Sequence, residues 1–100
     1  MLWAIYCVDR PNSTDLRMKL RPEHLEYLKE KDSMIVLAGA TLTDDGVTMT
    51  GSVIIIDAPD RATAEAFSEG DPFRKGGLFE SVVIKRMRKG IWNPAHMPEA

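Results

Sequence analysis

Apolar residues follow two different spacings along the chain, and the alternation between these spacings predicts the order of the elements. Three largely apolar runs have the composition of strands, residues 2–8, 34–40 and 51–57, and residues 79–87 also have strand composition. Between them, residues 14–31 and 60–70 carry apolar side chains three or four positions apart, which is typical of helices. The predicted order is therefore strand, helix, strand, strand, helix, strand.

This order is the split βαβ pattern of a ferredoxin-like domain of the α+β class, βαββαβ, with a mostly antiparallel sheet and two helices on one face. A chain of 100 residues has the size of one domain with a single thin core. We assign this domain to residues 1–88. Residues 89–100 carry two prolines and no periodicity, and we expect this C-terminal tail to lie over the surface or to be mobile.

The ends of the two predicted helices carry different signals. Ser13 precedes the first helix as a candidate N-cap, and Asp60 precedes the second. Pro22 lies inside the first helical segment, and because proline disfavours helix interiors, the helix is either kinked there or restarts at Pro22. Gly70 is typical of a helix end, so the second helix is expected to stop there.

One face of the first predicted helix is apolar except at a single position. The stripe with the spacing of one helical face consists of Leu16, Leu20, His24, Tyr27 and Leu28. We place the charged side chains of Arg17, Lys19, Glu23, Glu26 and Lys29 largely outside the stripe. His24 stands where a leucine is expected, so its imidazole should point toward the sheet.

The predicted strands are apolar on both faces, which conflicts with a sheet that has one face in water. In the first strand, two alternating sets are both apolar: Trp3, Ile5 and Cys7 against Leu2, Ala4, Tyr6 and Val8. Two helices cover only one face, so we predict that the sheet of a second copy covers the other and forms a homodimer. The alternative is a monomer whose tail folds across the sheet.

Composition and charge exclude several classes of protein. With 13 basic and 15 acidic side chains, the net charge of −2 argues against nucleic-acid binding, and the basic run at residues 85–89 is interpreted as a solvated strand end. The single cysteine, Cys7, and the lack of metal-ligand spacing predict neither a disulfide framework nor a metal site. The chain shows no signal-peptide pattern and no apolar run near the roughly 20 residues of a membrane span. We therefore expect a cytoplasmic protein.

Two residues are candidates for chemistry, and each also has an ordinary structural interpretation. His24 is either a core-edge histidine bonded to backbone or a general acid or base. Asp71 precedes a proline and can cap a helix, and the two roles are compatible, since one carboxylate oxygen can cap while the other orients a histidine. Trp3, Tyr6 and Tyr27 can line a pocket for a ring-shaped ligand, although aromatic residues on such elements are more often core.

Short motifs occur in a fixed order along residues 1–88. They include Leu2-Trp3-Ala4-Ile5-Tyr6, Arg21-Pro22-Glu23-His24-Leu25-Glu26-Tyr27-Leu28, Leu37-Ala38-Gly39, Asp71-Pro72-Phe73 and Gly77-Leu78-Phe79-Glu80. This set resembles the YciI-like (YCII-related) family. The resemblance implies a dimeric α/β barrel of ferredoxin-like protomers with an active site of one histidine and one aspartate, which by motif are His24 and Asp71. Phe73 stands where the family often has tyrosine.

The resemblance and the candidate pair together predict a small cofactor-independent enzyme. It would act by proton transfer on a small cyclic or aromatic molecule, as an isomerase or as a lyase of the dehydrochlorinase type. His24 would be the general acid or base and Asp71 would hold its tautomer, while Tyr6, Trp3 and Phe73 would contact the substrate. The alternative is a non-catalytic module for small-ligand binding or dimerisation, in which the pair holds the first helix in place.

Overall fold

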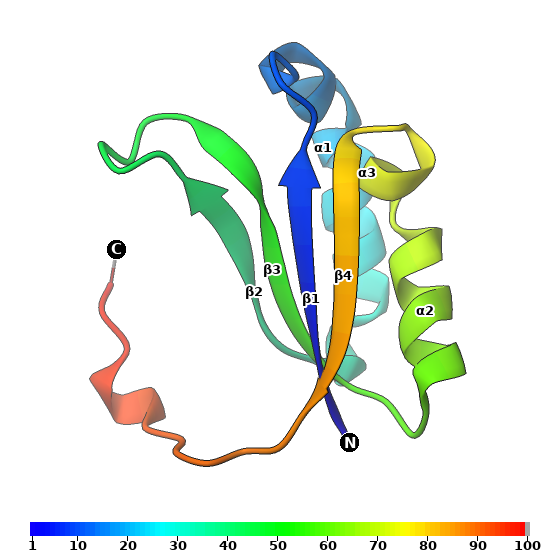
Figure 1. Cartoon of the computed structure of the whole chain (residues 1–100), viewed down its shortest axis with the longest axis vertical. Coiled ribbons are helices and arrows are strands. Elements are labelled where there is room, and N and C mark those ends of the chain that lie inside the picture. Colours follow the sequence, from blue (N-terminus) through cyan, green and yellow to red (C-terminus); the bar gives the residue numbers. More distant parts are fainter. Residues whose placement is uncertain (100) are drawn as a thin grey trace.

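The computed structural model describes residues 1–99, which form a four-stranded antiparallel sheet with its helices on one face (Figure 1). The strands are β1 (Leu2–Asp9), β2 (Ile35–Leu42), β3 (Met49–Asp57) and β4 (Phe79–Met87), in the spatial order β2-β3-β1-β4. The helices are α1 (Thr14–Glu30), α2 (Arg61–Gly70) and α3 (Pro72–Lys75), with 3₁₀ turns η1 (Asp32–Met34) and η2 (Pro94–His96). The predicted α+β, ferredoxin-like fold is confirmed, and α3 is the short helix that follows Asp71.

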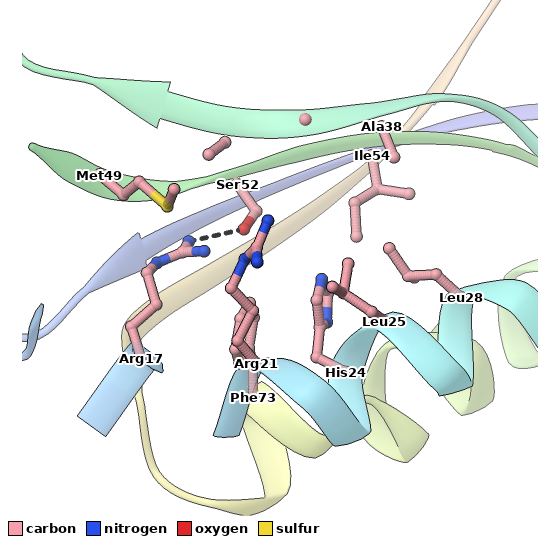
Figure 2. A pocket seen from close by; sticks show the side chains of 12 residues that line it. Arg17, Arg21, His24, Leu25, Leu28, Ala38, Met49, Ser52, Ile54 and Phe73 are labelled. Atoms are coloured by element: carbon pink, nitrogen blue, oxygen red, sulfur yellow. Dashed lines mark hydrogen bonds between the residues drawn. The ribbon is translucent and has the colours of Figure 1, made fainter. Parts of the chain in front are cut away.

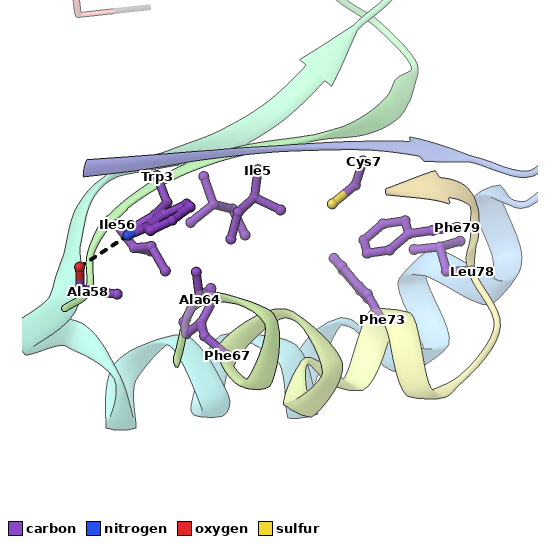
Figure 3. Close-up of a cluster of buried hydrophobic side chains, with 11 residues drawn as sticks. Trp3, Ile5, Cys7, Ile56, Ala58, Ala64, Phe67, Phe73, Leu78 and Phe79 are labelled. Atoms are coloured by element: carbon purple, nitrogen blue, oxygen red, sulfur yellow. Dashed lines mark hydrogen bonds between the residues drawn. The ribbon is translucent and has the colours of Figure 1, made fainter. Parts of the chain in front are cut away.

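The hydrophobic core lies between the sheet and the helices, because alternate strand residues point to this face. Figure 3 shows β1 contributing Trp3 and Cys7 at opposite ends of the core, above α2 and α3. The buried apolar side chains are Trp3, Ile5, Cys7, Ile54, Ile56, Ala58, Ala64, Phe67, Phe73, Leu78 and Phe79. Burial of each large apolar side chain contributes about 1.5–3 kcal/mol, so this one layer holds the helices on the sheet.

Helix α1 is continuous, so it neither breaks nor restarts at Pro22, which lies inside it. The expected side-chain cap at Ser13 is wrong: the Ser13 hydroxyl donates to the carbonyl oxygen of Pro11 and accepts no amide proton of the helix. The cap predicted for α2 is confirmed, since Asp60 Oδ1 accepts from the amide of Thr63 at 2.8 Å. The two helices therefore begin by different means.

The second face of the sheet is apolar, and no segment of residues 1–99 covers it. Tyr6, Leu37 and Val83 on this face are 51%, 43% and 43% exposed. The tail swings outward from the foot of β4 (Figure 1), and Ile91 and Trp92 approach the face only at one end. The tail does not fold across the sheet, so the open face remains available to a second copy.

Candidate active site

His24 and Asp71 are 47 positions apart in the chain and meet where α1 packs against the start of α3. The Nδ1 atom of His24 lies 2.7 Å from Oδ1 of Asp71, and the two residues are 7% and 2% exposed. Asp71 is also the N-cap of α3, because the same Oδ1 accepts from the amide of Phe73 at 2.9 Å. One carboxylate oxygen performs both roles, in place of the two oxygens that the sequence suggested.

A close contact at Gly70 places α1 beside Asp71. A Cβ atom at Gly70 would lie 2.5 Å from the hydroxyl oxygen of Tyr27, so only glycine fits there without displacing the α1 ring. The Tyr27 hydroxyl donates to the carbonyl of Phe67 at 2.8 Å. Burial raises the pKa of Tyr27, and the Asp71 carboxylate raises it further, which keeps this hydroxyl protonated as a donor. The contact holds α1 against the end of α2, directly before Asp71 in the sequence.

The contacts of His24 fix both its tautomer and its ring plane. An ionised carboxylate can only accept hydrogen bonds, so Nδ1 carries the proton and donates it to Asp71. The Nε2 atom then keeps its lone pair, and it has no hydrogen-bond partner within residues 1–99. The imidazole stacks on the ring of Phe73 at 3.8 Å between centroids and 11° between planes. His24 is thus prepared to accept a proton at Nε2.

His24 lines a cavity of about 180 Å³ between α1 and strands β2 and β3 (Figure 2). Leu25, Leu28 and Ile54 form apolar parts of its wall, and Phe73 lies beside His24. A protein cavity of roughly 150 Å³ binds benzene. The site therefore has the volume for a molecule with one ring and small substituents.

Arg17 lies at one end of this cavity, and its position corrects the sequence interpretation. It was expected largely outside the apolar stripe of α1, yet it is 4% exposed. Its guanidinium forms an ion pair with Asp9 at 2.8 Å, donates to the carbonyl of Gly51 and to Ser52 Oγ, and lies over the Phe73 ring at 4.6 Å. The charge of Arg17 is thus matched by Asp9, and its donors hold β1 and β3 against α1.

Arg21 is a lining residue that we did not identify as functional from the sequence. It is half-buried and its side chain rises from α1 into the cavity (Figure 2). The signal was present in the spacing, since positions 17, 21, 24 and 28 follow the i, i+4, i+7, i+11 pattern of one helical face. We selected the neighbouring apolar stripe, placed Arg17 largely outside it and gave Arg21 no role.

The remaining sequence candidates divide between this site and other places. Phe73 lines the cavity beside His24. Trp3 lies at the other end of the core, where its indole nitrogen donates to the carbonyl of Ala58 at 3.1 Å (Figure 3). Tyr6 lies on the open face of the sheet. The structure therefore brings His24, Asp71 and Phe73 together, and it does not bring Trp3 or Tyr6 to them.

Cys7 lies in the core near the site but is held in its unreactive form. Burial raises the pKa of the Cys7 thiol to about 12, and the nearby Asp71 carboxylate adds to this effect. A thiol that stays protonated is a poor nucleophile. Within residues 1–99, no three His, Cys, Asp or Glu side chains gather to hold a metal ion, and no helix there is long and apolar enough to cross a bilayer.

Comparisons with known proteins match this chain to a family. Residues 1–88 match the YCII-related domain. Protein YciI of Escherichia coli is 30% identical over 96 residues, which cover 89% of this chain and 98% of that protein. An uncharacterised protein of Haemophilus influenzae is 26% identical over the same shares.

Two solved structures extend the comparison to the fold. The 5-chloro-2-hydroxyhydroquinone dehydrochlorinase TftG of Burkholderia phenoliruptrix, in complex with 2,5-dihydroxybenzoquinone, is 37% identical with a TM-score of 0.85, over 90% of this chain and 96% of that chain. Protein Atu4242 of Agrobacterium tumefaciens shares the fold, with a TM-score of 0.55 and 17% identity over 94% and 98%. Because the domain match includes both His24 and Asp71 and agrees with the motifs found in the sequence, the chain belongs to the YCII-related family.

Proposed function

We propose that this protein is a small cofactor-independent enzyme that moves a proton on a single-ring organic substrate, with His24 as the general base. The observation that carries the proposal is the buried His24–Asp71 pair, which leaves Nε2 of His24 free. His24 also lines a cavity with the volume for one ring. Asp71 holds the productive tautomer and stabilises the imidazolium that forms. Phe73 contributes a ring against which His24 is held in plane.

Two reactions use this arrangement. In an elimination of HX, Nε2 takes a proton from the substrate, the freed electron pair forms a new double bond, and the bond to the halogen breaks with loss of halide. In an isomerisation, Nε2 takes a proton from one atom and the imidazolium returns it to another. The similarity to a dehydrochlorinase at 37% identity supports the elimination, and we propose it as the first reaction to test.

We also propose that the protein acts as a homodimer. The open face of the sheet carries exposed Tyr6, Leu37 and Val83, and a second sheet packed on this face would remove their apolar surface from water. The cytoplasmic location stays a prediction from the sequence.

A second candidate function is a non-catalytic ligand-binding or dimerisation module. The observation in its favour is that Asp71 also caps α3 through the amide of Phe73. A pair that links α1 to α3 has a structural reason to exist without turnover.

Chloride release from 5-chloro-2-hydroxyhydroquinone distinguishes the two functions. We expect the wild type to release chloride, and His24→Gln to lose about 10²–10⁴-fold in rate, the usual contribution of a general base. His96→Gln is the matched control, because His96 is exposed and lies in the tail, and it should retain the wild-type rate. If His24→Gln keeps the wild-type rate, His24 is not the base. If the wild type turns over neither this compound nor a panel of phenols and lactones, the module is the better description.

A further inference from the structure

Arg21 presents an uncompensated positive charge to the cavity. Its side chain rises from α1 toward the strands, one turn before His24 (Figure 2). Its guanidinium forms no ion pair or hydrogen bond within residues 1–99. Charged side chains in proteins are almost never fully buried unless they are paired, because removing an unpaired charge from water is costly. The lack of a partner therefore points to an anion from outside the chain.

The acidic side chains near the cavity are already paired with residues other than Arg21. Asp9 matches the charge of Arg17 at 2.8 Å, and Asp71 is already engaged by His24. No acidic side chain is among the cavity-lining residues that the structure describes. Arg21 is thus the cation at this site without a matching carboxylate.

Ser52 supplies a second donor at the same place. It is 3% exposed, lines the cavity, and its Oγ accepts a hydrogen bond from Arg17 at 2.9 Å. A hydroxyl that accepts in this way keeps its own proton to donate, and within residues 1–99 this proton has no acceptor. Figure 2 shows Ser52 projecting from β3 and Arg21 from α1 into the same cavity. The remaining wall near them is apolar and suits the face of a ring.

We propose that Arg21 and Ser52 form an anion-binding subsite for the charged oxygen of a one-ring ligand, namely a phenolate, enolate or carboxylate. The inference shares its cavity with the proposed function and names the class of substrate for it. Charge that develops on this oxygen when His24 removes a proton would be stabilised by Arg21, as in other preorganised sites for oxyanions. Arg21 therefore selects acidic substrates and also favours the proton transfer.

The test measures binding of a matched pair of ligands, benzoate and benzamide, which share a shape and differ in charge. Titrations followed by isothermal calorimetry and by NMR shifts of the His24 ring compare the wild type with Arg21→Gln and Arg21→Lys. We expect Arg21→Gln to weaken benzoate binding about ten- to hundredfold, the range of one charge-assisted hydrogen bond. Arg21→Lys should recover part of this loss, because lysine keeps the charge without the planar fork.

Lys19→Gln is the matched control. It removes one positive charge from the same helix at an exposed position outside the cavity, and it should leave benzoate binding unchanged. Arg21→Gln should keep or raise the melting temperature, since it removes an unpaired charge at a ligand site. A lower melting temperature with unchanged benzoate affinity would show a structural role and overturn the proposal.

The outcomes separate this proposal from the proposed function. If the wild type binds neither benzoate nor the anion of 2,5-dihydroxybenzoquinone, or if Arg21→Gln weakens benzamide as much as benzoate, the anion subsite is wrong. Proton transfer by His24 can still be tested on neutral substrates in that case. If benzoate binds through Arg21 and the His24→Ala variant retains this binding, the subsite stands even where no turnover is found.

Discussion

The His24–Asp71 pair should show a measurable coupling free energy, and its size follows from the contacts. Asp71→Ala removes the cap on the amide of Phe73 and the acceptor for His24 Nδ1. Loss of an N-cap costs about 1 kcal/mol, and loss of a hydrogen bond to a charged group costs about 1.5–3 kcal/mol. The free energy of unfolding should therefore fall by about 2.5–4 kcal/mol. In a His24→Ala background the second contribution is absent, so Asp71→Ala should cost only about 1 kcal/mol.

Urea unfolding followed by tryptophan fluorescence measures this difference. Trp3 is 4% exposed and reports the core, whereas Trp92 is 51% exposed and changes little. All variants are compared at one protein concentration, because a dimer makes stability depend on concentration. Asp60→Ala is the matched control, since Asp60 caps α2 through Thr63 and has no histidine partner. Its cost should be the same with and without His24. Equal costs of Asp71→Ala in both backgrounds would refute the coupling.

Three further predictions use other parts of the chain. Asp9→Asn leaves Arg17 buried without its counter-charge, so unfolding in urea should show a loss of about 3–5 kcal/mol. Burial raises the pKa of Cys7 from 9.0 to about 12, so the native thiol should resist a disulfide reagent at pH 8. The free energy of unfolding should also fall as the pH rises from 9 toward 12, because in this range the Cys7 thiol loses its proton only in the unfolded chain. Rapid labelling of the native protein would contradict this. Tyr6→Lys on the open face should give a monomer by size-exclusion chromatography with light scattering, whereas Met18→Lys, exposed on α1, should not; an unchanged mass for Tyr6→Lys would place the interface elsewhere.

The element order and the two-sided apolar strands were predictable because both follow from local spacing. The residues of β1 alternate between the two faces whatever else the chain does, so Trp3 and Tyr6 could be assigned to opposite faces from the sequence. Their assignment to one pocket did not respect that alternation. The core position of His24 was also predictable, because its stripe follows one face of α1. What spacing cannot predict is a contact over 47 positions: the sequence by itself offered Asp71 as a residue that could orient a histidine, and the motifs of the family supplied the pairing with His24.

Arg17 and Arg21 show where local reasoning stops. The two arginines lie one turn apart on α1, so periodicity gives them the same face and composition gives them the same charge. Arg17 is neutralised because β1 ends in Asp9 and β3 passes close enough to offer the carbonyl of Gly51. The approach of these strands depends on Gly51, where a Cβ would meet the carbonyl oxygen of Cys7. Arg21 lies beyond the reach of that carboxylate, so the same residue type becomes a structural clamp at one position and a free cation at the next. The difference arises from the tertiary arrangement of the strands, which the spacing of the two arginines along the helix does not encode.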